Sequence, residues 1–279
     1  MSPLVPGAAD ARDTWHRRAA VHVGQALRLL LRPARWRDPV LEPKRLAIFA
    51  VAAVVALILL SLIVDASAAR GARALPHWLV NLFDDVTDFG KAGWFLWPIG
   101  ILLLVMAALP DRLPARTRLT MIAIAIRLEF LFVAIAAPSL FATIVKRLIG
   151  RARPYIGGSL DPSYFSPLVW RSEFAAMPSG HATTAVAAAV AISTLWPRAR
   201  TVAWIYALLI MASRVVLTAH YVTDVLAGAI VGAAGVILVR RYFADRRLGF
   251  SVTSAGGIVQ YPVPSGRRVK AVARAALAE

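Results

Sequence analysis

The sequence predicts an all-α fold, a polytopic bundle of six membrane-spanning helices, from three observations. Hydrophobic residues make up 59% of the 279 residues and charged residues only 17%, whereas soluble domains carry about a quarter charged residues. The mean hydropathy is +0.65. The net charge of +17 is spread between long apolar runs. Because this charge is not gathered on one polar face, we expect a membrane protein without a nucleic-acid partner.

Six segments have the apolarity and the length of roughly 17 to 25 residues that a spanning helix requires. They are residues 46–64, 93–109, 119–145, 183–196, 201–217 and 221–239. The fourth is the shortest and could begin earlier, near Ser179. That earlier start would lengthen it to a full span.

Lys and Arg residues are distributed unevenly across the predicted membrane. Residues 1–45, the loops at 110–118 and 197–200 and the C-terminal tail hold 22 of the 32, whereas the loops at 65–92 and 146–182 together hold eight. Cytoplasmic loops are enriched in Lys and Arg. Both termini are therefore expected in the cytoplasm, and the two lysine- and arginine-poor loops are expected outside.

This orientation divides the chain into a cytoplasmic N-terminal segment (1–44), a membrane domain (45–243) and a cytoplasmic C-terminal tail (244–279). Within the first part, Ala20 to Arg32 is basic and amphipathic, so it either lies on the cytoplasmic leaflet or belongs to a poorly ordered tail. After Arg247 the sequence contains Gly, Ser and Pro without a clear period, and we expect a tail without chemistry.

Polar residues from three separate segments are expected at the outer membrane surface. The first segment is Lys146 to Pro154, after the third span, and the second is Pro178 to His181, before the fourth. The third runs from Ser213 to Asp224, between the fifth and sixth spans. Polar groups at membrane depth are costly and therefore point to function. Segments distant in sequence are thus predicted to form one site.

The cations of these segments indicate an anion site. Lys146, Arg153 and Arg214 would repel one another unless an anion lies between them, and the guanidinium fork matches phosphate oxygens. Ser179 and Gly180 stand where a helix begins, so their amides and the helix dipole also favour a phosphate. The arrangement predicts a site for a phosphoryl group.

Two histidines and one carboxylate supply the chemistry. His220 and Asp224 are four residues apart, so on a helix they would share a face and could hydrogen-bond. A carboxylate on one ring nitrogen leaves the other free to attack phosphorus, and His181 could donate a proton to the leaving oxygen. The pair could instead bind a metal, but the surrounding cations would repel a divalent ion and no third ligand is evident. We therefore expect neither a metal nor another cofactor.

These residues resemble the three-part signature of the type 2 phosphatidic acid phosphatase superfamily, which includes bacterial lipid phosphatases, acid phosphatases and vanadium haloperoxidases. The signature is a Lys with Arg-Pro after six residues (Lys146 to Pro154), then Pro-Ser-Gly-His (Pro178 to His181), then Ser-Arg, five residues, His, three residues and Asp (Ser213 to Asp224). All three parts are complete and in order. The six spans resemble the membrane branch of this superfamily.

The resemblance implies a metal-independent, two-step phosphatase with a phosphohistidine intermediate. Carried over by position, His220 is the nucleophile, Asp224 its orienting partner and His181 the general acid. The phosphate-binding residues would be Lys146, Arg153, Ser179, Gly180 and Arg214. The implied substrate is a lipid phosphomonoester or diphosphate at the outer face of a bacterial inner membrane: phosphatidate, phosphatidylglycerophosphate, undecaprenyl diphosphate or lipid A.

Other interpretations of the function stay open. A lipid phosphotransferase, in which a lipid acceptor replaces water, would use the same residues. A non-catalytic anion transporter is suggested by Arg127 and Glu129, because charges inside a span can line a pathway. The transporter leaves the arrangement of His181, His220 and Asp224 unexplained. The oligomeric state is not predicted.

The loop between the third and fourth spans is expected to choose the substrate. Residues 155–177 are rich in aromatic side chains and would form a lid over the site. Arg171 and Glu173 either contact a headgroup or form a solvated pair. No further feature of the sequence links Arg147 and Arg151 to a phosphate, and we interpret both as interfacial anchors.

Overall fold

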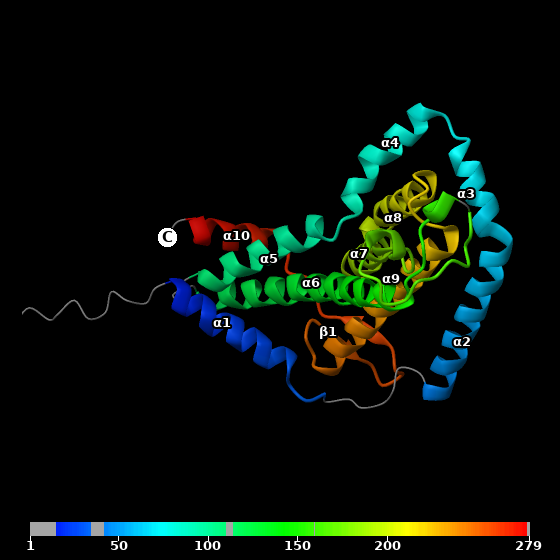
Figure 1. Ribbon diagram of the computed structural model, residues 1–279. Coiled ribbons are helices and arrows are strands. Elements are labelled where there is room, and N and C mark those ends of the chain that lie inside the picture. Colours follow the sequence, from blue (N-terminus) through cyan, green and yellow to red (C-terminus); the bar gives the residue numbers. More distant parts are fainter. Residues whose placement is uncertain (1–14, 35–41, 110–113, 159, 278–279) are drawn as a thin grey trace, which may run out of the picture. The chain divides into compact units, whose positions relative to one another are not determined.

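The computed structural model describes residues 15–34, 42–109, 114–158 and 160–277, and this part of the chain is predominantly helical (Figure 1). Much of the predicted N-terminal segment and part of the loop at 110–118 lie outside the described residues. The all-α prediction is confirmed, apart from one two-stranded hairpin.

Each predicted span corresponds to a helix. The first is a continuous run of α2 (Pro43–Leu60), the π-helical turn η1 (Ser61–Asp65) and α3 (Ala66–Arg73). The second combines α4 (His77–Thr87), the 3-10 turn η2 (Asp88–Gly90) and α5 (Gly93–Ala108). The others are α6 (Ala115–Ile149), α7 (Gly180–Leu195), α8 (Arg200–Val216) and α9 (Val222–Asp245). Three more 3-10 turns connect them: η3 (Ile156–Gly158), η4 (Ser172–Phe174) and η5 (Pro197–Ala199).

Five helical segments of the described chain are long and apolar enough to cross a membrane. The sixth, α7, has 16 residues and is a shorter apolar helix. It begins at Gly180, as the earlier of the two possible starts predicted. The chain is therefore a multi-pass membrane protein, while the count of six spans and the cytoplasmic location of the termini remain predictions.

The described residues form two compact units. One contains residues 42–97, 130–158 and 160–242, and the other contains residues 15–34, 98–109, 114–129 and 243–277. All residues of the predicted site belong to the first unit.

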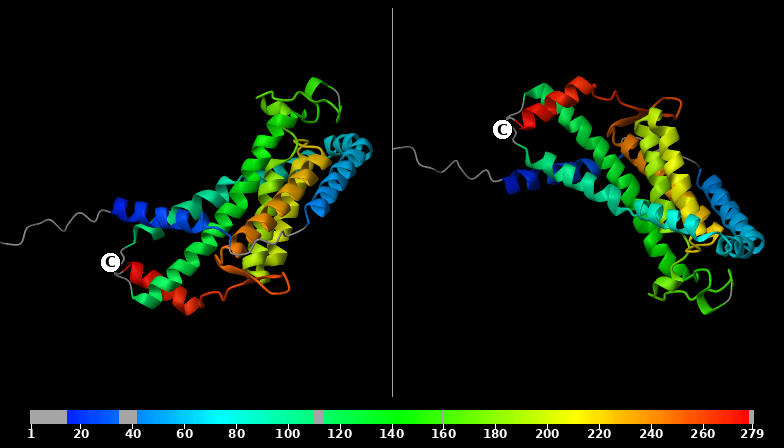
Figure 2. Two further views of the ribbon diagram at one scale, coloured as in Figure 1. Left: turned by 90° about the horizontal axis from the view of Figure 1, so that it is seen from below. Right: turned by 90° about the horizontal axis from the view of Figure 1, so that it is seen from above.

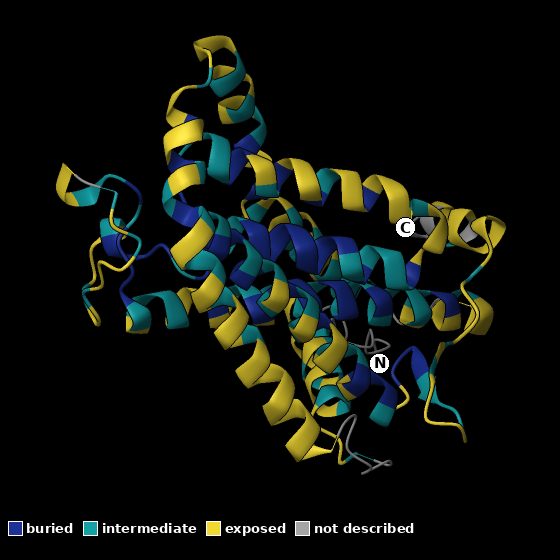
Figure 3. Cartoon of the chain, turned by 90° about the vertical axis from the view of Figure 1, so that its right-hand side faces the viewer, coloured by how far each residue is buried: buried dark blue, intermediate teal, exposed yellow. Residues whose placement is uncertain are grey.

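The core of the first unit is α7, which has ten buried residues, most of them alanine. Small side chains allow neighbouring helices to approach closely. Gly228 of α9 is one such position, because a Cβ there would come within 2.5 Å of the Ser179 carbonyl oxygen. Both views of Figure 2 show α7, α8 and α9 running alongside one another, and Figure 3 shows the buried residues gathered on the inner helices. This close packing brings the start of α7 to the start of α9.

The second unit contains α1 (Trp15–Leu30), a hairpin of β1 (Phe250–Val252) and β2 (Ile258–Gln260), and α10 (Gly266–Leu277). Regular structure therefore extends beyond Arg247, and the expectation of a tail without chemistry stays a prediction. Arg127 of α6 donates to the carbonyl oxygens of Tyr261 and Pro262, both at 2.9 Å. These bonds pair the Arg127 guanidinium with backbone carbonyl groups of its own unit.

Candidate active site

The first motif leaves the end of α6 through a sharp turn. Gly150 has a φ of +63°, a left-handed conformation that glycine adopts at helix ends without a steric penalty. The next three residues are held by backbone hydrogen bonds on both sides, from Ala152 N to Tyr164 O, from Arg153 N to Glu173 O and from Ala176 N to Arg151 O. The backbone of residues 151–153 is therefore held in place, which orients the side chains that it carries.

The cations predicted to bind phosphate act on one another electrostatically. The charge of Arg153 acts on both Lys146 and Arg214. Lys146 Nζ lies 3.9 Å from the position that a Cβ would take on Gly180. Burial lowers the pKa of Arg153, which remains a cation at neutral pH. The structure thus brings together basic residues from the ends of α6 and α8, as the sequence predicts.

The second motif forms the start of α7. Ser179 is the N-cap residue and makes no side-chain capping bond, so the first-turn amides have no intrahelical acceptor. The expectation that the Ser179 amide faces a phosphate is wrong, because this N–H donates to the Asp224 carbonyl oxygen at 2.9 Å. His181 is half-buried in the first turn, and the charges of Arg214, Lys146 and Lys91 act on it.

The third motif begins at the end of α8. Arg214 is buried, and its Nη1 donates to Thr87 Oγ1 at 2.6 Å. Ser213 Oγ donates to the same hydroxyl at 3.0 Å. Thr87 ends α4, in a segment that the sequence analysis did not connect with the site. It fixes one side of the Arg214 guanidinium.

His220 and Asp224 meet through a turn rather than along a helix. The amides of Ala219 and His220 both donate to the Arg214 carbonyl oxygen, and α9 begins only at Val222. His220 Nδ1 lies 3.7 Å from Asp224 Oδ2, and the Tyr221 amide donates to that same oxygen at 2.9 Å. Burial lowers the pKa of His220, against the opposing effect of Asp224. The ring is therefore neutral at pH 7 and can act as a nucleophile.

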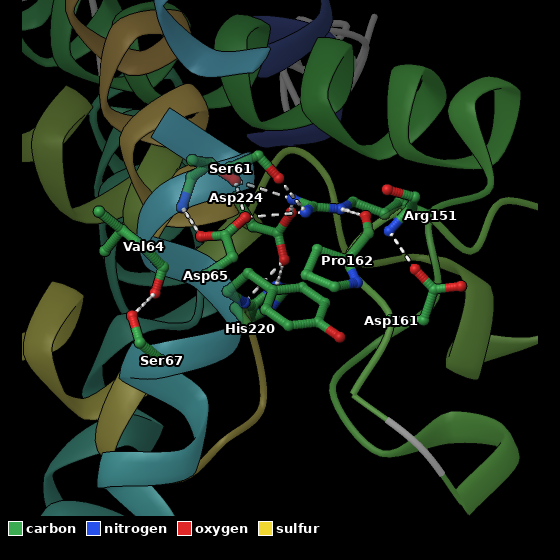
Figure 4. Close-up of polar contacts among 12 residues, drawn as sticks. Ser61, Val64, Asp65, Ser67, Arg151, Asp161, Pro162, His220 and Asp224 are labelled. Carbon is green, nitrogen blue, oxygen red and sulfur yellow. Dashed lines mark hydrogen bonds and ion pairs between the residues drawn. The ribbon is translucent and has the colours of Figure 1, made fainter. Parts of the chain in front are cut away.

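Arg151 is buried, so its interpretation as an interfacial anchor is wrong. Only 1% of the residue is exposed, and its guanidinium bridges two carboxylates (Figure 4). Nη1 lies 2.6 Å from Asp224 Oδ1, and Nη2 lies 2.8 Å from Asp65 Oδ2. Asp65, which is fully buried, was missed by the sequence analysis. The available signal was a single carboxylate directly after nineteen uncharged residues of the first span.

Four buried polar atoms of the predicted site have no hydrogen-bond partner in the described chain. They are Arg153 Nε, Ser179 Oγ, Arg214 Nε and His220 Nδ1. Buried polar atoms in proteins nearly always have a partner. Donors left open beside a neutral histidine suit an anionic group that presents several oxygens.

The loop that follows the first motif is tied to the rest of its unit. Tyr155 donates from its hydroxyl to the Ala69 carbonyl oxygen at 2.8 Å. Arg171 and Glu173 form an ion pair of 2.6 Å at the surface, which agrees with the solvated pair considered above. Trp170 is 82% exposed. The role of this loop as a lid stays a prediction.

The chain is similar to known proteins. Residues 127–248 match the family model of the PAP2 superfamily. A lipid A 1-phosphatase of Rhizobium johnstonii is 32% identical over 203 residues, which cover 72% of this chain and 82% of that protein. The chain belongs to the PAP2 superfamily.

Two further proteins of this kind are similar to the chain. A lipid A 1-phosphatase of Rhizobium etli is 31% identical over 188 residues, covering 67% of this chain and 81% of that protein. A solved structure of a transmembrane PAP2 type phosphatidylglycerolphosphate phosphatase from Bacillus subtilis is 24% identical, with a TM-score of 0.48 over 69% of this chain and 94% of that one. The predicted resemblance is confirmed, and the PAP2 protein described here is a membrane phosphatase.

Proposed function

We propose that this PAP2 protein hydrolyses the phosphate of a membrane lipid of the lipid A class through a phosphohistidine on His220. The lipid class is supported by two lipid A 1-phosphatases, which are identical to this chain at about a third of the aligned residues. The mechanism is supported by a buried, neutral His220 beside Asp224.

In the first step, His220 Nε2 attacks phosphorus while the bond between phosphorus and the lipid oxygen breaks. The electron pair of that bond goes to the leaving oxygen, which takes a proton from His181. In the second step, a water molecule gives its proton back to His181 and attacks phosphorus, and the P–N bond breaks to release phosphate. Arg153, Arg214 and Lys146 stabilise the negative charge on the phosphoryl oxygens in both steps.

The observation that carries this proposal is the set of open polar atoms around His220. Arg153 Nε, Ser179 Oγ and Arg214 Nε are buried without a partner in the described chain. A phosphoryl group presents three oxygens that can accept from such donors. This chemistry requires no metal, and we propose metal-independent hydrolysis.

The mechanism is tested with lipid carrying ³²P in its phosphate, in the presence of excess EDTA. The wild type should release labelled phosphate. When the reaction is stopped with alkali, the wild-type protein should also retain label. His220→Ala should do neither, whereas His77→Ala, an exposed histidine of α4, should behave like the wild type. Lipid A, phosphatidate, phosphatidylglycerophosphate and undecaprenyl diphosphate should be compared, and lipid A is expected to give the highest kcat/KM.

Three results would overturn parts of this proposal. Phosphate release by His220→Ala at more than a few per cent of the wild-type rate excludes the covalent mechanism. Loss of activity in EDTA that added magnesium or zinc restores excludes metal-independent hydrolysis. A higher kcat/KM on another lipid excludes lipid A as the preferred substrate, and transfer of label to an added lipid alcohol would identify a phosphotransferase.

We further propose that the site faces the periplasm across a bacterial inner membrane, because the loops that build it are poor in Lys and Arg. The chain has no cysteine, so single cysteines can be introduced without background. Trp170→Cys, in the loop after α6, should react with an impermeant maleimide in intact spheroplasts, whereas Arg116→Cys, at the start of α6, should react only after permeabilisation. The reverse pattern would place the site in the cytoplasm.

A further inference from the structure

A buried carboxylate follows directly after the most exposed part of the first helical run. In the described structure, α2 has no buried residue, yet Asp65 is fully buried in the π-helical turn that follows. Such turns within α-helices are frequent at functional sites. A charge in a membrane span is costly and is retained where it has a task.

Asp65 and Arg151 form a closed network around Asp224. All five guanidinium donors of Arg151 have partners: Nε donates to Pro162 O at 3.0 Å, Nη1 to Thr223 Oγ1 and Asp224 Oδ1, and Nη2 to Ser61 Oγ and Asp65 Oδ2. Asp65 also accepts from the amide and the hydroxyl of Thr223. Oδ1 of Asp224 is thereby engaged by Arg151, and Oδ2 is the oxygen that faces His220.

The net charge of this network affects the proposed attack of His220 on phosphorus. When His220 attacks phosphorus, its ring becomes positive, and a negative Asp224 stabilises that charge. Arg151 alone would neutralise Asp224 and weaken this effect. Asp65 compensates for Arg151, so two ionised carboxylates and one guanidinium leave a net charge of −1 beside the ring.

We propose that Asp65 and Arg151 are positioning residues of the phosphatase, which hold Asp224 in place and preserve its negative charge toward His220. This inference rests on the proposed function of His220 as nucleophile. A buried ion pair contributes little to stability compared with apolar side chains of similar size. The burial of three charges at this point is therefore better explained by their effect on His220.

The test uses variants that change the charge of the network with little change in shape. Asp65→Asn brings the net charge from −1 to 0, Arg151→Gln brings it to −2, and the double variant restores −1. The readout is the acid limb of the pH profile of kcat/KM, which reports protonation of His220 in the free enzyme. The other groups that act on His220 are Asp224, Arg214, Arg153 and His181, and they stay unchanged.

The two single variants should shift the acid limb in opposite directions. Losing a negative charge disfavours the protonated ring, so Asp65→Asn should move the limb to lower pH, and Arg151→Gln should move it to higher pH. The double variant should return it toward the wild type. Asp65→Asn should also lower kcat by about 10- to 100-fold with KM near the wild-type value, as happens when outer partners of a functional ligand are removed.

Ser61→Ala is the matched control, because it removes a neutral hydrogen bond from the same Nη2 atom. Its acid limb should not move. If Asp65→Asn does not accumulate in the membrane, the comparison of Arg151→Gln with the double variant gives the same test. An acid limb that stays in place, or moves in one direction in all charge variants, would overturn the inference. The wild type would still form the phosphoenzyme in that case, so failure of the inference is distinguishable from failure of the proposed mechanism.

Discussion

The arginines near Asp224 and His220 fall into two groups, Arg151 in one and Arg153 with Arg214 in the other, and their hydrogen bonds differ. Every donor of Arg151 is taken by the protein. Arg153 and Arg214, in contrast, each leave Nε buried without a partner in the described chain. The first arrangement fixes neighbouring side chains, and the second leaves donors for a ligand.

The difference shows that proximity to His220 alone does not identify an arginine with an open donor. Arg151 and Arg153 are two positions apart on the same backbone-tied segment, yet only Arg153 keeps a donor without a partner in the described chain. What separates them is ion pairing. Arg151 lies 2.8 Å from Asp65 and 2.6 Å from Asp224, whereas carboxylates act on Arg153 and Arg214 without an ion pair among the described residues.

The largest expected effect concerns Arg214. Arg214→Gln should lower kcat/KM by about 10²- to 10³-fold, because it removes a charge that stabilises the transition state. Its melting temperature in detergent should be equal to or above that of the wild type, since one of several mutually repelling cations is lost. Arg151→Gln should instead be destabilised by about 3–5 kcal/mol, because it leaves buried carboxylates without their partner. Equal melting temperatures of the two variants would contradict the division between binding and positioning arginines.

The second prediction concerns ligand binding without turnover. Vanadate, which adopts the five-coordinate geometry of the transferring phosphorus, should bind the open donors and raise the melting temperature. At about 100 times its Kd, the stabilisation corresponds to about 2.7 kcal/mol. Arg153→Gln should lose most of this shift, whereas Ser61→Ala should keep it. A full vanadate shift in Arg153→Gln would show that its open donor does not face the phosphoryl site.

Sequence patterns single out one of these two groups. The helices follow from apolar length, and the residues that we propose to bind phosphate follow from three motifs whose spacing is complete. The closed network around Arg151 and the contact of Thr87 with Arg214 were out of reach, because Asp65 and Thr87 belong to the first two spans, far from any motif in sequence. Their partners are set by how η1 and α4 pack, which neither hydropathy nor spacing encodes.

The relation of His220 to Asp224 shows a second limit of the same kind. Four residues of separation suggested neighbouring positions on one helix, but α9 begins after His220. The two side chains meet because the turn folds back onto the Arg214 carbonyl oxygen. The side chains thus approach to 3.7 Å through a different backbone geometry, without the hydrogen bond that helical spacing suggested, since a four-residue spacing fits both a helix and a turn.

The smallest expected effect concerns Thr87. This residue holds Arg214 by a hydrogen bond, as the protein holds Arg151, yet Arg214 also has an open donor. Thr87→Val keeps the shape of the side chain and removes the hydroxyl that accepts from Arg214 Nη1 at 2.6 Å. A hydrogen bond to a charged group contributes about 1.5–3 kcal/mol net, and the lower end of this range corresponds to about a 10-fold loss of kcat/KM. Thr194→Val, which removes only a local bond to the Val190 carbonyl oxygen, is the matched control and should leave kcat/KM unchanged. A loss for Thr87→Val as large as that of Arg214→Gln would mean that the guanidinium depends on Thr87 for its position altogether, and Arg214 would then belong with Arg151 rather than with Arg153.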